Sequence, residues 1–137
     1  MDVQEVKKLD AYLKRVFATQ RIRVVPRTSN DESAEVFIGE EKLGDLAVDD
    51  EDEDRSYNFR MEFELGQGAD IDQNKLLDMY LRRKFDNERI RVVGRPKKDD
   101  SVEIYLDEEF IGVVFIENEK GRRTFILEMP ILEMDLA

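Results

Sequence analysis

The sequence predicts an α+β fold, a tandem duplication in which each copy has one helix and a four-stranded antiparallel meander. Two observations predict it. The 137-residue chain matches itself without a gap at an offset of 68 residues, with 21 identities over the 53 positions of 9–61 and 77–129. In each half, apolar residues first follow a helical period and then alternate as they do in strands. We therefore expect a first copy at 1–65, a linker at 66–70 and a second copy at 71–137.

A helix opens each copy, because apolar residues recur there at intervals of three and four positions. In the first copy Asp2 and Glu5 have the spacing of a capping box, which marks the start of a helix. The apolar stripe of the first copy consists of Val3, Val6, Leu9, Leu13, Val16 and Phe17. The stripe of the second copy consists of Ile71, Leu77, Tyr80, Leu81 and Phe85.

Four short strands follow each helix, because runs of β-branched and aromatic residues alternate with polar residues and are separated by turn residues. The acidic run DDEDED, at 49–54, is expected to form one of these turns. The predicted strands of the first copy cover 21–26, 34–39, 43–48 and 56–64. Those of the second copy cover 89–94, 102–107, 110–116 and 123–132.

The size of each copy predicts how the two are arranged. One helix on one face of one antiparallel sheet makes each copy an α+β unit. A unit this small has a marginal core when it stands alone. We therefore expect the copies to pack on each other with pseudo-twofold symmetry, as the subunits of a homodimer do.

The run RIRVV occurs once in each copy and places arginines on the outward face of a strand. One interpretation is structural: the arginines pair with Glu35 and Glu103 and stack on Phe37 and Tyr105 of the neighbouring strand. The other interpretation is a cationic face in each copy that binds an anion or an acidic peptide. This candidate anion or partner face consists of Arg21, Arg23, Arg27, Arg89, Arg91 and Arg95.

The copies differ on the outward side of their third and fourth strands. The second copy has a candidate apolar interface there, consisting of Val113, Phe115 and Ile126. The equivalent positions of the first copy hold Asp45, Ala47 and Asn58. Because the shared fold does not require apolar residues at these positions, something should cover them: the first copy, a second molecule or a different protein.

The residue types restrict the chemistry. The chain has no cysteine and no histidine, so it lacks thiolate nucleophiles, disulfides, the commonest general base and the commonest transition-metal ligand. The acidic run at 49–54 lacks the glycine and the twelfth-position glutamate of an EF-hand loop, so we expect no specific calcium site there. No phosphate-binding, dinucleotide-binding or nucleophile-elbow motif is present. We expect no enzyme activity, no catalytic residue, no cofactor and no bound metal.

The charge balance indicates the kind of partner. The chain has 33 acidic and 22 basic residues, a net charge of −11. Such a surface repels nucleic acid and anionic lipid and favours cationic partners. No apolar run approaches the roughly 20 residues of a membrane span, and the first residues lack the apolar centre of a secretory signal. We expect a cytoplasmic protein with no membrane or nucleic-acid partner.

Two stretches of the second copy resemble a known family. RIRVVGRPKKDDSVEIYLDEEFIGVVFIENEKG and the ending LEMPILEMDL are similar to an uncharacterised alphaproteobacterial family of short, single-copy proteins, classified as a domain of unknown function. The resemblance covers nearly all of both halves and is closest in the second. The first copy departs in TSNDESAEVFIGEEKLGDLAVDDEDED, where the apolar third strand is degraded. The resemblance implies a fused dimer with one diverged half, and it implies no activity, cofactor or catalytic residue.

These observations favour a non-enzymatic protein–protein interaction or regulatory module with a protein partner, and homodimerisation remains open. An alternative is a small-anion or nucleotide sensor that uses the paired arginine faces. An unrecognised enzyme is a remoter alternative.

Overall fold

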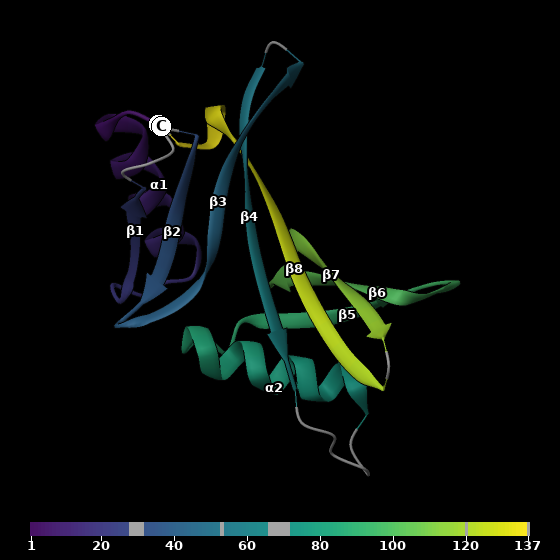
Figure 1. Ribbon diagram of the computed structural model, residues 1–137. Coiled ribbons are helices and arrows are strands. Elements are labelled where there is room, and N and C mark those ends of the chain that lie inside the picture. The colour runs from purple at the N-terminus through teal and green to yellow at the C-terminus, as the bar shows by residue number, and fades with distance from the viewer. Residues whose placement is uncertain (28–31, 53, 66–71, 120, 137) are drawn as a thin grey trace. The chain divides into compact units, whose positions relative to one another are not determined.

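The computed structural model covers residues 1–137 and describes all of them except 28–31, 53, 66–71, 120 and 137; the side chains of 50–52, 54, 98 and 99 are also outside the description. The described part of the chain contains two α-helices and eight antiparallel strands, so the predicted α+β class is confirmed. The predicted four-stranded meander of each copy is not confirmed as a sheet of its own. The strands form one sheet in the order β1-β2-β3-β4-β8-β7-β6-β5 (Figure 1). The predicted twofold relation stays a prediction.

The first copy begins with the predicted capping box. The Glu5 backbone N–H donates to Asp2 Oδ1 at 2.8 Å, and the Asp2 N–H donates to Glu5 Oε1 at 3.1 Å. Both groups would otherwise be unpaired at the helix terminus, so the box fixes where the helix starts. The elements of this copy are α1 (Val3–Val16), β1 (Ile22–Pro26), β2 (Ser33–Ile38), β3 (Glu41–Asp52) and β4 (Asp54–Glu64).

The second copy repeats this order with a different helix start. Asp72 caps its helix by accepting from the Asn74 N–H at 3.0 Å, and Asp86 ends it in the left-handed conformation with φ 50°. The predicted stripe residue Ile71 lies outside the described residues. The elements are α2 (Gln73–Phe85), β5 (Ile90–Arg95), β6 (Lys98–Leu106), β7 (Glu109–Glu119), β8 (Arg122–Leu132) and the short 3-10 helix η1 (Glu133–Leu136).

The acidic run at 49–54 is mostly strand backbone and not the predicted turn. β3 continues to Asp52 and β4 begins at Asp54, so the two strands form one long hairpin. Alternation of apolar residues stops at Val48, which is why the sequence pattern ends the strand too early. The side chains of 50–54 lie outside the described residues. They make up most of the acidic run in which we expected no specific calcium site.

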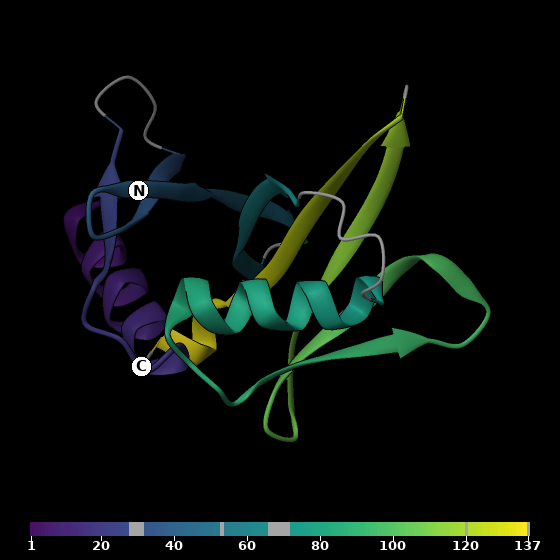
Figure 2. The ribbon, with the colours of Figure 1, turned by 90° about the horizontal axis from the view of Figure 1, so that it is seen from below.

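A helix carboxylate binds the first strand in both copies. Asp10 of α1 accepts from the Val24 N–H at 2.9 Å, and Asp78 of α2 accepts from the Val92 N–H at 3.3 Å. β1 and β5 are the two edge strands of the sheet order, where backbone N–H groups lack a strand partner on one side. The carboxylates therefore satisfy edge groups and fix each helix on its strand, as the contacts of α1 with β1 and α2 with β5 show (Figures 1 and 2).

A β-bulge in each copy turns one extra residue toward the core. The register of β2 and β3 shifts beside Gly44, and that of β6 and β7 shifts beside Gly112. The bulged residues Leu43 and Ile111 are both buried. A bulge lets two residues face one on the partner strand, so the residue before each bulged one points outward.

The chain divides into two compact units that do not coincide with the two copies. Unit 1 comprises residues 1–61 and 130–137, and unit 2 comprises residues 62–129. The ends of the fourth strands are therefore exchanged: the end of β4 belongs to unit 2, and the end of β8 with η1 belongs to unit 1. Figure 1 shows η1 beside α1, the two elements of unit 1 that are farthest apart in the chain.

Candidate functional site

The central arginines of the RIRVV runs stack on aromatic rings, as predicted. The Arg23 guanidinium lies 5.2 Å from the centroid of the Phe37 ring, and that of Arg91 lies 5.3 Å from the centroid of the Tyr105 ring. Each stacked pair lies directly opposite on adjacent strands. The same two arginines donate to the backbone carbonyls of Gly39, at 2.9 Å, and of Asp107, at 2.7 Å.

The predicted ion pairs of these arginines with Glu35 and Glu103 are wrong. In the register, Glu35 lies opposite Val25 and Glu103 lies opposite Val93, two positions farther along the strand. Strand alternation placed all these side chains on the correct face but could not supply the register. Glu35 instead pairs with Lys42 at 3.1 Å, and Glu103 accepts from the Tyr105 hydroxyl at 3.3 Å.

The outer arginines of the runs have different partners in the two copies. Arg89 pairs with the Asp107 carboxylate at 2.6 Å. The residue equivalent to Asp107 in the first copy is Gly39, and the part of the chain that the structure describes supplies no side-chain partner for Arg21. The side chains of Arg21 and Arg23 therefore both lie beside Gly39, whereas the side chains of Arg89 and Arg91 both bind Asp107.

The third arginine of each copy does not join these pairs. Arg27 lies just beyond the end of β1, and Arg95 is the last residue of β5. Arg27 forms an ion pair with Asp45, and Arg95 donates to the Ser101 hydroxyl at 3.0 Å. The six predicted arginines are thus held in several separate contacts. Within the described part of the chain, five of them, all but Arg21, donate to a carbonyl, hydroxyl or carboxylate oxygen.

Ion pairs cover the outward face of the first copy. Lys42 contacts both Glu35, at 3.1 Å, and Asp45, at 3.3 Å, and Asp45 also binds Arg27. The hydrogen bond with Glu35, followed by that with Asp45, raises the pKa of Lys42. This face is therefore a connected polar network whose charges are mutually compensated.

The second copy is apolar at the same positions. Phe110 replaces Lys42, and its side chain is 46% exposed; Phe115, which replaces Ala47, is 37% exposed. Phe110 packs edge-on against Tyr105, with ring centroids 5.7 Å apart. We call the outward group formed by Tyr105, Phe110, Val113 and Phe115 the apolar face.

Ile126 does not belong to the open surface, contrary to the sequence prediction. It is only 7% exposed. It lies on β8, which has a neighbouring strand on each side, and directly opposite Phe115. Side chains paired in this way are about 5 Å apart, so Ile126 and Phe115 are neighbours on the sheet. Phe110, which was not predicted, takes its place because the bulge in β7 turns it outward.

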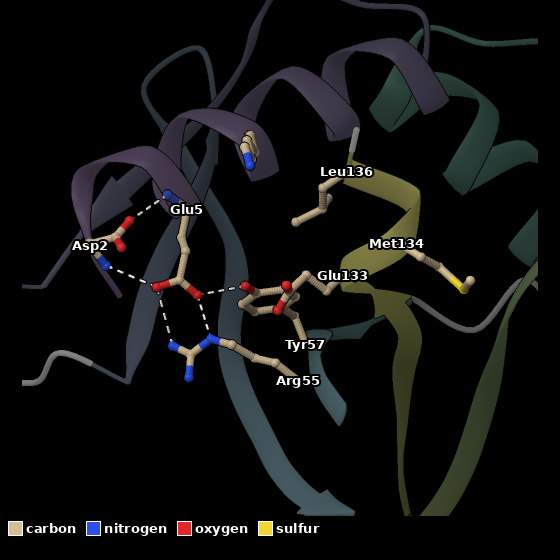
Figure 3. A pocket seen from close by; sticks show the side chains of 8 residues that line it. Asp2, Glu5, Arg55, Tyr57, Glu133, Met134 and Leu136 are labelled. Atoms are coloured by element: carbon tan, nitrogen blue, oxygen red, sulfur yellow. Dashed lines mark hydrogen bonds and ion pairs between the residues drawn. The ribbon is translucent and has the colours of Figure 1, made fainter. Parts of the chain in front are cut away.

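A polar hollow of about 450 Å³ lies at the start of α1 in unit 1 (Figure 3). The Glu5 carboxylate is its centre: it accepts from the Arg55 guanidinium, from the Tyr57 hydroxyl at 2.6 Å and from the Asp2 N–H. Figure 3 shows all three donors converging on this one carboxylate. The lining residues are Asp2, Glu5, Lys8, Arg55, Tyr57, Glu133, Met134 and Leu136.

The protonation states in this cluster are strongly fixed. Burial raises the pKa of Glu5, but hydrogen bonds from Tyr57, Arg55 and Asp2 outweigh it and lower the pKa to about 2. Burial, followed by the hydrogen bond to Glu5, raises the pKa of Tyr57 to about 12. The hydrogen bond to Glu5 also raises the pKa of Arg55. At neutral pH Glu5 is therefore ionised, and Tyr57 and Arg55 keep their protons.

Sequence reasoning missed this cluster. Glu5 is predicted only as half of a capping box and Tyr57 only as part of a strand, and Arg55 lies just before that predicted strand. One signal was available: Arg55 and its counterpart Arg123 are identical, whereas Glu5 and Tyr57 correspond to Gln73 and Phe125. The second copy therefore cannot form the same ionic cluster.

The described residues contain no group of three or more acidic side chains placed to hold a metal ion. They also contain no helix of the length and apolarity needed to cross a membrane.

Comparisons with known proteins agree with the internal duplication. The model of a family described as "Protein of unknown function (DUF3126)" matches the chain twice, at residues 5–64 and 73–135. No curated protein and no solved structure matches the chain.

Proposed function

Because this chain belongs to the DUF3126 family and carries the family unit twice, each copy serves as a reference for the other, and we propose that the second copy has become a protein-binding module. In this proposal the protein is not an enzyme, and the apolar face of β6 and β7 binds a polypeptide partner.

The main support for the proposal is that the ion-paired surface of the first copy is replaced by apolar and aromatic residues in the second. Lys42, Asp45 and Ala47 of the first copy become Phe110, Val113 and Phe115 in the second. Both copies have the same strands, pairing and bulge at these positions. The fold is therefore compatible with a polar face, and its stability does not explain the apolar one.

The geometry of the apolar face suits the centre of an interface. Exposed aromatic rings supply large contact areas at low conformational cost, and Phe, Tyr and Trp are enriched at the centres of protein interfaces. Phe110 is held by its edge-on contact with Tyr105, and Tyr105 is held by the Arg91 guanidinium above its ring. The rings are thus pre-organised, which reduces the entropy lost on binding.

The partner should present an apolar surface that extends beyond this face. A stable interface buries about 800 Å² on each partner, more than two partly exposed rings provide. The partner must therefore also contact the polar rim, where Arg91, Arg95 and Glu103 lie. A second copy of this chain fits less well, because two molecules with a net charge of −11 repel each other.

The fixed protonation of the Glu5 cluster supports a non-enzymatic role. A general acid or base works best with a pKa near the operating pH. The pKa values of Glu5, about 2, and of Tyr57, about 12, are far from neutrality in opposite directions. Glu5, Arg55 and Tyr57 therefore act as a structural clasp.

Site-specific photo-crosslinking tests the proposal. A photoreactive phenylalanine analogue is placed at Phe115 or, as the matched control, at Ala47, and each variant is irradiated in the cells that make the protein. We expect an adduct with another polypeptide from position 115 only, and we expect Phe110→Lys with Val113→Asp to remove it. Equal adducts from both positions, no adduct from 115, or an adduct with this chain alone would overturn the proposal.

A further inference from the structure

The turn after the second strand differs between the copies by a single carboxylate. In the second copy Asp107 occupies this turn with φ 54°, and its side chain binds Arg89 at 2.6 Å. In the first copy Gly39 occupies the turn with φ 59°. The backbone is otherwise the same: the Asp107 N–H donates to the Arg89 carbonyl at 2.9 Å, and the Gly39 N–H donates to the Arg21 carbonyl at 3.0 Å.

The Arg21 side chain lies where that missing carboxylate would be attached. A Cβ atom built on Gly39 would lie 3.2 Å from Arg21 Nη2. Arg23 is fixed beside it, with its guanidinium on the Phe37 ring and two donors on the Gly39 carbonyl. The first copy thus keeps both arginines and the turn, while the group that neutralises the outer arginine is absent.

We propose that the corner formed by Arg21, Arg23 and Gly39 binds a carboxylate from outside the chain, in the position that the Asp107 side chain occupies in the second copy. Guanidinium groups bind carboxylates through charge-assisted hydrogen bonds, and a planar guanidinium can use two at once. The acidic residues that follow the turn, Glu40 and Glu41 or Glu108 and Glu109, are the same in both copies and do not account for the difference. The site shares no residue with the apolar face and does not depend on the function proposed for it.

The carboxylate could belong to a small acid or to an acidic side chain of a polypeptide, and two probes distinguish these sources. Sodium acetate and a blocked peptide, acetyl-Ala-Asp-Ala-amide, are titrated into the isotopically labelled full chain at constant ionic strength. The Nε–Hε resonances of the arginines are followed by NMR. We expect a saturable shift of the Arg21 signal and a smaller one of the Arg89 signal. Equal responses to equal concentrations of the two probes mean that the carboxylate alone is recognised. A stronger response to the peptide identifies a polypeptide source.

Substitution of Gly39 provides the decisive control. Gly39→Asp restores the second copy's carboxylate, so the Arg21 shift should be lost. Gly39→Asn fills the same position without a charge, and both residues tolerate the left-handed conformation. The asparagine variant should therefore weaken the shift less than Gly39→Asp, which both fills the position and neutralises Arg21.

The reciprocal variant, Asp107→Gly, installs the first copy's residue and should create a response at Arg89 equal to that at Arg21. Three results would each overturn the proposal: no saturable shift at Arg21, a shift that survives Gly39→Asp, or equal shifts at Arg21 and Arg89 in the unaltered chain.

Discussion

At the scale of single residues, Glu5 has two roles: it completes the cap of α1, and it links this helix to the sheet. Glu5 accepts from the helix terminus, as a capping box requires, and also from Arg55 and Tyr57 of β4. Charged hydrogen bonds are worth more than neutral ones, so this carboxylate couples the start of α1 to the sheet. The capping box was predictable from the spacing of two residues. The tertiary contacts were not, because the partners lie about fifty positions away and no local pattern marks them.

Glu5→Gln, which installs the second copy's residue, should destabilise unit 1. Glutamine keeps one acceptor oxygen but loses the charge and turns an NH2 donor toward the donors of Arg55 and Tyr57, so we expect the free energy of unfolding at pH 7 to fall by about 1–3 kcal/mol. Chemical denaturation of both variants measures this difference. The matched control is Gln73→Glu in the second copy, where Phe125 cannot donate, and we expect no comparable gain in stability.

The same pair of proteins should show a defined pH dependence. Folding lowers the pKa of Glu5 from 4.5 to about 2. As the pH falls, Glu5 is therefore protonated in the unfolded chain before it is protonated in the folded chain. The stabilisation by Glu5 is therefore complete above pH 4.5 and is lost as the pH falls toward 2. The difference in unfolding free energy between wild type and Glu5→Gln should shrink across this interval. A difference that stays constant down to pH 2 would contradict the assigned contacts.

At the scale of secondary structure, the order of the elements was predictable and their register was not. Alternation and turn residues placed each strand to within a few positions, because burial on one face imposes a period of two. The bulges at Leu43 and Ile111 break that period by one residue. They depend on a close approach between strands, which the sequence indicates only by the paired glycines Gly44 and Gly112.

These two glycines should therefore be among the least replaceable residues. A Cβ atom at Gly44 would lie 2.1 Å from the Arg60 carbonyl oxygen, and one at Gly112 would lie 2.6 Å from that of Glu128. Because backbone cannot move aside cheaply, alanine at either position should cost about 1–3 kcal/mol or more. Thermal and chemical unfolding measure the loss. Gly94→Ala is the control, since its Cβ atom would contact only the Asn74 side chain, at 3.5 Å. Equal losses of stability at all three glycines would refute the bulge geometry.

At the scale of the whole molecule, the exchanged ends mean that neither copy coincides with a compact unit. Phe63, from the end of the first copy, stacks on Tyr80 and Phe125 of unit 2 at centroid distances of 4.4 and 5.6 Å. Its counterpart Ile131, from the second copy, is fully buried in unit 1. The sequence revealed the duplication but not this exchange, because a repeat pattern does not say which copy a strand end packs against.

Truncating these two side chains should have crossed effects. Phe63→Ala should destabilise unit 2 by about 3–5 kcal/mol, and Ile131→Ala should destabilise unit 1 by about 2–5 kcal/mol, since each leaves a cavity in a buried core. Hydrogen exchange resolves the two units: the first variant should lower protection in α2 and the second in α1. Each variant is the control for the other. Loss of protection in the copy that carries the mutation would show that the ends are not exchanged.

The central claim is that the apolar face of the second copy binds a polypeptide, and calorimetric titration tests it most directly. The polypeptide that crosslinks through position 115 is titrated against wild type and against Phe110→Lys, Val113→Asp, Phe115→Ala, which installs the first copy's residues. The fold already accepts these residues in the first copy, so the midpoint of unfolding should hold. We predict binding weaker by about a hundredfold, or ~2.7 kcal/mol, as expected when central aromatic contacts are lost. An unchanged affinity in a folded triple variant would contradict the claim.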